Sequence, residues 1–351
     1  MPSIDRIAPY LKFAQDHNAS DVHLIAGIPP AFRIDGEIIL SNAPPLTPEE
    51  TTRFVQELIN DHQRDDLERN LELCFSILRS EFGRFRMTIY YQAGHPELAI
   101  RRGTVDIPTR EDLGLPEVVE HLARRRSGLV LVTGPTGMGK TTTLSFMLDL
   151  INSERRCKIV TIEDPIEYVH RPKKALIVQQ EVNADVRSFS RALIHVLRQD
   201  PDVICVGEMR DLETIRTALT AAETGHLVLA TLHTPNALQT MERIVTVFPA
   251  EEQNQIIAQL ANTIQGVVAQ LLLPRANKRG RVLAVEILVA TAAVRSHIRQ
   301  SEFHKLGTVI QTGKKFGMNT MDDSLKHLYE RAEITHDMMI SHQQERHANL
   351  D

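Results

Sequence analysis

The residues best suited to chemistry form a glycine-rich loop, GPTGMGKTT, at residues 134–142. Residues 134–141 fit the phosphate-loop pattern G-x-x-x-x-G-K-[ST], between a short apolar run and a stretch with helical spacing of apolar residues. In such loops backbone N–H groups surround the phosphates, the lysine reaches the β- and γ-phosphates, and the next hydroxyl binds Mg²⁺. A nucleoside triphosphate site is therefore predicted. Its expected binding residues are Gly134, Pro135, Thr136, Gly137, Met138, Gly139, Lys140, Thr141 and Thr142.

Acidic residues follow two other apolar runs, and parallel strands would bring them to the same sheet edge as the loop. Glu208 ends the run at 203–207 and, as in a Walker B element, is expected beside Mg²⁺. Glu163 and Glu167 follow the run at 159–162. Because carboxylates at one triphosphate repel one another unless cations offset them, at least one is expected to hold or activate the attacking water. Alternatively, Glu163 has no catalytic role and is an ordinary solvated acid or a helix cap.

Two histidines, His226 and His233, flank the predicted strand at 227–232. At about 3.3 Å per residue their rings should lie roughly 23 Å apart and on opposite faces, so they cannot share a metal within this strand. His233 is expected at the carboxyl end, where it can sense or polarise the γ-phosphate. His226 is at the opposite end and is expected at a subunit contact.

Arginines in predicted strands near the amino terminus are candidates for a catalytic arginine. Arg84, Arg86 and Arg101 lie there without a local excess of acids. A guanidinium is planar and permanently charged, so another domain or subunit can supply it to a bound phosphate as an arginine finger. Alternatively, each of these arginines has no catalytic role and lies on an ordinary solvated face of its strand.

The bulk composition is that of an ordinary globular protein. Its 351 residues are 42% apolar and 24% charged, which suits about two domains. A net charge of −5 and a pI near 6.3 give no overall attraction to phosphate backbones, so nucleic acid is not expected as a partner. The cysteines form no C-x-x-C pair, and no apolar run approaches about 18 residues. We therefore expect a cytoplasmic protein without a zinc site or membrane span.

The spacing of apolar residues divides the chain into two parts and predicts an α/β protein. In residues 1–102, strands alternate with helices at 4–16, 48–60 and 61–70, which indicates an α+β domain with a mostly antiparallel sheet and a hairpin turning at Asp35 and Gly36. Residues 103–116 lack periodicity, as a linker does. Residues 117–351 alternate strands and helices around a largely parallel sheet, with a helical region from about 292 to 351. The strands predicted there are 129–133, 158–163, 175–178, 203–207, 227–232 and 281–288.

Several of these segments, in the same order along the chain, resemble the type II/IV secretion superfamily ATPases and, within them, the type IV pilus retraction (twitching motility) ATPases, the PilT-like group. The resemblance covers nearly the whole chain. Besides the phosphate loop it rests on EDPIE at 163–167, DPDVICVGEMRD at 200–211 and the histidine box within 221–234. It also includes ASDVHL at 19–24, PPAFRIDG at 29–36, GRFR at 83–86, and IQTG and GMNTMD within 310–322.

The resemblance implies a PAS-like first domain, a RecA-like ATPase domain and a homohexamer, with ATP and Mg²⁺ between the two domains. It implies Glu167 as general base, Glu208 at Mg²⁺ and the water, and coupling roles for His226 and His233. The residues themselves do not separate Glu163 from Glu167 as the base. Arginines corresponding to Arg84, Arg86 or Arg101 would complete the site. The resemblance also implies that the protein acts at the cytoplasmic face of the inner membrane, attached to a polytopic pilus platform protein. There, ATP hydrolysis would power the removal of pilin subunits.

Two segments depart from the pattern of the retraction group. AVRSHIRQ at 293–300 keeps Arg295 and Arg299, which we expect to act in coupling or at an interface, but lacks the usual acidic end. QQEVN at 179–183 lacks an expected arginine and glycine. The direction of work therefore stays open between retraction, as main or accessory motor, and pilus assembly or type II secretion.

The composition and the predicted acids disfavour two functions from other classes. The acidic net charge and the lack of basic stretches interleaved with aromatics count against a RecA-like nucleic-acid translocase. The acids predicted at the sheet edge count against a scaffold that binds nucleotide without turnover.

Overall fold

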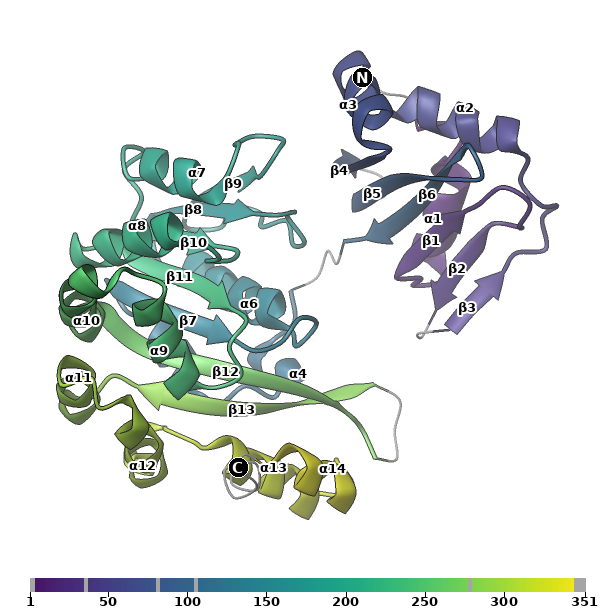
Figure 1. Cartoon of the computed structure of the whole chain (residues 1–351). Coiled ribbons are helices and arrows are strands. Elements are labelled where there is room, and N and C mark those ends of the chain that lie inside the picture. Colours follow the sequence, from purple (N-terminus) through teal and green to yellow (C-terminus); the bar gives the residue numbers. More distant parts are fainter. Residues whose placement is uncertain (1–3, 35–36, 80–82, 104–106, 277–279, 344–351) are drawn as a thin grey trace. The chain divides into compact units, whose positions relative to one another are not determined.

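The computed structural model describes residues 4–34, 37–79, 83–103, 107–276 and 280–343. The chain forms two compact units: the first comprises Met1–Asp106 with Pro165–Val169, and the second comprises Ile107–Asp164 with His170–Asp351. Figure 1 draws most of the first unit in purple and blue, and the second from blue through green to yellow. Each unit has a hydrophobic core of its own, so each is described by itself.

The first unit contains a six-stranded sheet in the order β3-β2-β1-β6-β5-β4, and its neighbouring strands are all antiparallel. The predicted antiparallel sheet is thus confirmed, whereas the predicted turn at Asp35 and Gly36 lies outside the described residues. The strands are β1 (Asp21–Leu24), β2 (Ala31–Ile34), β3 (Glu37–Leu40), β4 (Glu72–Arg79), β5 (Gly83–Gln92) and β6 (His95–Arg102).

Helices α1 (Ala8–Asp16), α2 (Pro48–Leu58) and α3 (Asp61–Asn70) supply side chains to the core on one face of this sheet. Thr47 and Glu50 form the predicted capping box at the start of α2. Helix α1 begins at Ala8 instead of the predicted residue 4, because a proline fits only the first turn of a helix and Pro9 occupies that turn.

The second unit contains a seven-stranded sheet in the order β13-β12-β7-β11-β10-β8-β9. All neighbouring pairs are parallel except β12 and β13, so the predicted largely parallel sheet is confirmed. The strands are β7 (Gly128–Thr133), β8 (Lys158–Glu163), β9 (Leu176–Glu181), β10 (Val203–Val206), β11 (Leu227–Leu232), β12 (Ile264–Pro274) and β13 (Arg281–Val289).

Strand β12 is absent from the sequence prediction, although it lies directly beside β7 in the sheet. It follows helix α10 (Ala250–Thr263) directly, so no loop residue separates the helix from the strand in the sequence. Apolar periodicity cannot separate the two without a turn signal between them.

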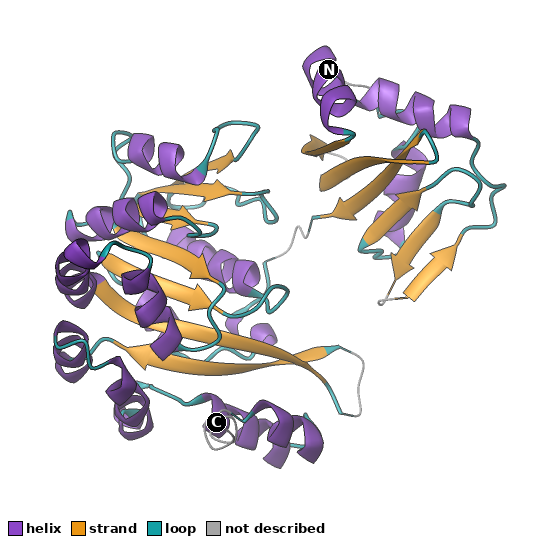
Figure 2. Ribbon diagram, viewed as in Figure 1, coloured by secondary structure: helices purple, strands orange, loops and turns teal. Residues whose placement is uncertain are grey.

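Helices cover both faces of the seven-stranded sheet (Figure 2). One face packs against α5 (Val118–Ala123) and α6 (Lys140–Glu154). The other packs against α7 (Phe189–Val196), α8 (Leu212–Glu223), α9 (Ala237–Thr246) and α10. The chain then continues through α11 (Ala292–Arg299), η1 (Phe303–Lys305), α12 (Leu306–Thr312), η2 (Lys314–Phe316), α13 (Met321–Glu330) and α14 (His336–His342). The part of the predicted helical region at 344–351 lies outside the described residues.

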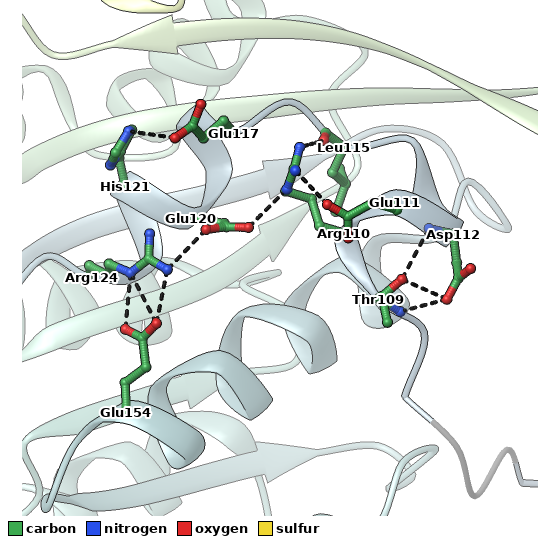
Figure 3. A network of polar contacts seen from close by, with 10 residues as sticks. All are labelled: Thr109, Arg110, Glu111, Asp112, Leu115, Glu117, Glu120, His121, Arg124 and Glu154. Carbon is green, nitrogen blue, oxygen red and sulfur yellow. Dashed lines mark hydrogen bonds and ion pairs between the residues drawn. The ribbon is translucent and has the colours of Figure 1, made fainter.

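The stretch predicted as a linker contains the short helix α4 (Arg110–Leu113), capped by Thr109. Figure 3 shows how ion pairs hold α4 to the rest of the second unit. Arg110 pairs with Glu120 at 2.8 Å, Arg124 pairs with Glu120 at 2.9 Å, and Arg124 also pairs with Glu154 at 2.9 Å. Because Glu154 is the last residue of α6, the chain of charges ends on the helix that follows the phosphate loop.

Candidate nucleotide-binding site

The phosphate loop connects β7, which ends at Thr133, to α6, which begins at Lys140. Gly134 has φ +138°, and a Cβ added there would lie 2.4 Å from the carbonyl oxygen of Gln270 on β12. Gly139 caps α6 in the left-handed region, with φ +81°. Glycine is therefore required at Gly134 by both backbone angle and space, and the amino end of α6 offers its positive pole to an anion.

Lys140 is the buried cation of the loop, with 8% of its surface exposed. Its Nζ donates to the carbonyl oxygens of Gly134 at 2.7 Å and Pro135 at 2.9 Å. Burial lowers the pKa of Lys140, while the negative charge of Glu208 opposes that shift. The ammonium is thus held inside the loop by neutral acceptors, and a phosphate oxygen there would provide the anionic partner that burial makes favourable.

Strand β12 and the start of β13 support the loop through residues that sequence reasoning missed. Gln270 Nε2 donates to Thr143 Oγ1 on α6 at 2.7 Å, and the Leu272 N–H donates to Met138 Sδ at 3.2 Å. Arg281 Nη1 donates to the Gly137 carbonyl oxygen at 3.3 Å. The signal that could have found them is the apolar run at 264–274 that forms β12, which the sequence prediction did not include as a strand.

Glu208 and His233 meet beside the loop. His233 Nε2 lies 3.0 Å from Glu208 Oε1, and His233 Nδ1 lies 3.2 Å from Thr136 Oγ1. Arg210 Nη2, which the sequence prediction did not include, lies 2.7 Å from Glu208 Oε2. Burial acts to raise the pKa of Glu208, but the hydrogen bond and charge of Arg210 and the interaction with His233 outweigh it, so the pKa lies below its ordinary value. Glu208 is therefore an anionic oxygen donor next to the phosphate loop.

The two acids of the EDPIE segment occupy different surroundings. Glu163 is the last residue of β8 and is buried, and its Oε1 accepts hydrogen bonds from Thr161 Oγ1 at 2.6 Å and Gln179 Nε2 at 3.0 Å. Glu167 is exposed and lies in Pro165–Val169, the segment that groups with the first unit. The assignment of one of them as general base stays a prediction.

The residues predicted to act in coupling have local partners. His226 Nδ1 lies 2.9 Å from the Ala221 carbonyl oxygen, and His226 precedes β11 whereas His233 follows it, as predicted. Arg295 Nη1 donates to the carbonyl oxygen of Asn262 at 2.8 Å, and Arg299 Nη2 donates to the side chain of the same residue at 3.0 Å. These arginines thus hold the negative end of α10.

The arginines of the first unit lie on the sheet face opposite its core. Arg86 on β5 and Arg101 on β6 are cross-strand neighbours, and Arg84 precedes Arg86 on the same face. Although the sequence shows no local excess of acids here, Arg101 has an acidic partner in the structure: its Nε lies 2.9 Å from Asp21 Oδ1. The strand pairing of β1 with β6 decides this contact. Burial acts to raise the pKa of Asp21, but hydrogen bonds from Ser20 and Arg101 outweigh it and hold the pKa low.

Two further properties bear on ligands and location. Within the described ranges, no group of three or more His, Cys, Asp or Glu side chains could hold a metal ion. No helix in the described part of the chain is both long enough and apolar enough to cross a membrane.

The chain is similar to proteins of known activity along most of its length. The profile of a family described as type II/IV secretion system protein matches residues 110–347. The type IV pilus retraction ATPase PilT of Pseudomonas aeruginosa is 46% identical, over 94% of this chain and 95% of its own. A twitching motility protein of Neisseria gonorrhoeae is 44% identical, over 88% of this chain and 83% of its own. The crystal structure of the pilus retraction motor PilT with bound ADP has a TM-score of 0.90 at 44% identity, covering 96% of this chain and 97% of that one.

Proposed function

Because the chain belongs to the type II/IV secretion system protein family, we propose that it is a hexameric, Mg²⁺-dependent motor that hydrolyses ATP to retract type IV pili. The predicted fold class, ATPase activity and resemblance to the retraction group are confirmed by the likeness to PilT. The solved relative binds ADP, which agrees with the nucleotide site predicted from the phosphate loop.

The observation that carries the proposal is the connection from Thr136 through His233 to Glu208 at the phosphate loop. A loop that only held nucleotide would not need a bridge to an ionised carboxylate. Because the histidine contacts both partners, a change at the phosphates can be passed to the acid that we place at the metal.

Thr141 and Glu208 are the residues that would hold Mg²⁺. They fit because Mg²⁺ at phosphates takes only one or two protein oxygens, and Glu208 is an ionised carboxylate with 18% of its side chain exposed. The bound ion would offset the charge that develops on the phosphates during transfer. Lys140 would bind the β- and γ-phosphates, and the other loop residues would surround them with N–H groups.

The attacking water would be held or activated by Glu163, the last residue of β8, or by Glu167 in the segment that follows it. An arginine among Arg84, Arg86 and Arg101 would complete the site, from the same or a neighbouring subunit. His226, Arg295 and Arg299 would act in coupling between subunits. The partners we propose are five further copies of the chain in a homohexamer and an inner-membrane pilus platform protein at the cytoplasmic face.

The direct test compares the wild type with Glu208→Gln, which keeps the shape of the side chain and removes its charge. We expect turnover of ATP to fall about 100-fold or more while fluorescent nucleotide binding changes little, because the charge acts mainly in the transition state. Glu213→Gln, an exposed acid on α8, is the matched control. Turnover in Glu208→Gln near the wild-type rate would reject the assignment.

The direction of work is tested in cells that lack the gene. We expect long pili to accumulate and surface motility to stop, because assembly continues without removal of pilin. Cells without pili would instead indicate an assembly motor.

A further inference from the structure

We infer that Gln179 is a positioning residue that holds the acidic loop between Glu163 and His170 in its working conformation. The inference rests on the proposed function, in which Glu163 or Glu167 handles the attacking water. Residue 179 begins the QQEVN segment, which departs from the pattern of the retraction group.

Gln179 lies on β9 opposite Thr161 of β8, because the two strands pair in parallel with these residues in register. Its Nε2 donates to Glu163 Oε1 at 3.0 Å, and its Oε1 accepts the backbone N–H of His170 at 2.8 Å. A backbone N–H can only donate, so this contact fixes which way round the amide lies. One side chain therefore joins the residue at which the acidic loop begins to the residue at which it ends.

The far end of the loop is also fixed to the helix of the phosphate loop. Asn152, a fully buried residue of α6, donates from Nδ2 to the Arg171 carbonyl oxygen at 2.8 Å and accepts the N–H of Lys173 at 2.9 Å. The chain just beyond His170 is thus attached to α6, whose first residue is Lys140. Gln179 completes this connection, because it links His170 to Glu163 by hydrogen bonds.

The chemistry of the amide explains why glutamine suits this position. Only a side chain with both a donor and an acceptor can serve a carboxylate at one end and an N–H at the other. Thr161 Oγ1 and Gln179 Nε2 both donate to Glu163 Oε1, so the orientation of the carboxylate is set by two contacts. A shift of about 1 Å in a group that aligns a reactant can cost about 100-fold in rate.

The experiment measures kcat and KM for ATP in Gln179→Met, which has a similar shape and neither hydrogen-bonding group. We expect kcat to fall about 10- to 100-fold while KM stays within about threefold, because nucleotide contacts are intact and only the acidic loop is released. Gln180→Met is the matched control, since residue 180 is the next residue of β9 and its side chain points to the opposite face of the strand. Its kcat is expected to stay near that of the wild type.

A second variant, Gln179→Glu, adds a readout that a merely structural role would not move. The introduced carboxylate can still accept the His170 N–H, but it places an anion beside Glu163 until it is protonated. We expect its kcat, relative to the wild type, to rise at least about threefold as pH falls from 8 to 6, because protonation restores a donor. This variant also decides the matter should Gln179→Met fail to fold.

The outcomes separate this inference from the proposed function. If Glu163→Gln or Glu167→Gln abolishes turnover but Gln179→Met keeps kcat within twofold of the wild type, the inference is wrong and the function stands. A large rise in KM at unchanged kcat would also overturn it, since that result indicates a role in binding. If neither acid variant loses turnover, the proposed role of the loop fails first, and the inference with it.

Discussion

His233 Nε2 lies 3.0 Å from Glu208 Oε1, on a ring whose other nitrogen contacts Thr136 of the phosphate loop. The sheet brings these residues together, because β11 pairs with β7 with Leu232 opposite Thr133, and β11 also pairs with β10. Residues that directly follow these strands are therefore neighbours. The contact between His233 and Glu208 therefore lies at the same edge of the sheet as Lys140.

Replacing His233 by alanine tests whether this bridge is used during turnover. We expect kcat for ATP to fall about tenfold or more, because general acid–base and polar aids of this kind contribute at least that much, while nucleotide binding changes little. Steady-state kinetics and fluorescent nucleotide titration measure the two effects. His195→Ala, at an exposed position on α7, is the control. An unchanged kcat in His233→Ala would remove His233 from the mechanism.

Gly134→Ala tests the close approach of the phosphate loop to β12. The added Cβ would meet the Gln270 carbonyl oxygen at 2.4 Å at a positive φ, so we expect a loss of about 1–3 kcal/mol in stability together with weaker nucleotide binding. Gly307→Ala is the matched control, because nothing lies within 4 Å of its added Cβ and its position is helical. It should be neutral or stabilising by up to about 1 kcal/mol. Equal unfolding curves for the two variants would contradict the packing argument.

The low pKa of the buried His170 side chain predicts that the stability of the protein depends on pH. Burial lowers its pKa to about 4 from 6.5, with Asp149 opposing the shift and Lys173 adding to it. Between these values the unfolded chain binds a proton that the folded chain does not, so stability falls as pH is lowered from about 6.5 to about 4, by about 1.4 kcal/mol per pH unit. Urea unfolding at pH 7 and pH 5 measures the loss.

His170→Gln removes the titrating ring while the backbone N–H that contacts Gln179 stays. We expect the variant to lose about 2 kcal/mol less than the wild type between pH 7 and pH 5, since about 1.5 of those pH units lie below the ordinary histidine pKa. The same pH dependence in both proteins would show that other groups are responsible.

Substitutions at Asp21 and Arg101 test whether Arg101 only contacts Asp21 or also acts at the phosphates. Because 70% of the Arg101 side chain is exposed, a double-mutant cycle with Asp21→Asn and Arg101→Ala should give a coupling below about 1 kcal/mol in unfolding free energy. Arg101→Ala should nevertheless lower ATP turnover more than Asp21→Asn does, if its guanidinium reaches the nucleotide as proposed. Equal turnover in the two variants would limit Arg101 to the contact with Asp21.

Much of the fold could be predicted from local patterns. Strands β8 and β11 have the predicted bounds, and α2 begins at the predicted capping box. Strand β12 could not be predicted in this way, because no turn residue separates it from α10 and its place beside β7 depends on long-range pairing. The support that Gln270 gives to α6 was missed for the same reason.

The sequence by itself determined the phosphate loop and the acids at or beyond the ends of β8 and β10, because glycine spacing and strand ends are local features. Only the tertiary structure decided which side chains meet: His233 with Glu208, Arg101 with Asp21, and Gln179 with both ends of the acidic loop. Strand order and register set these contacts, and both arise from hydrogen bonds between segments far apart in the chain.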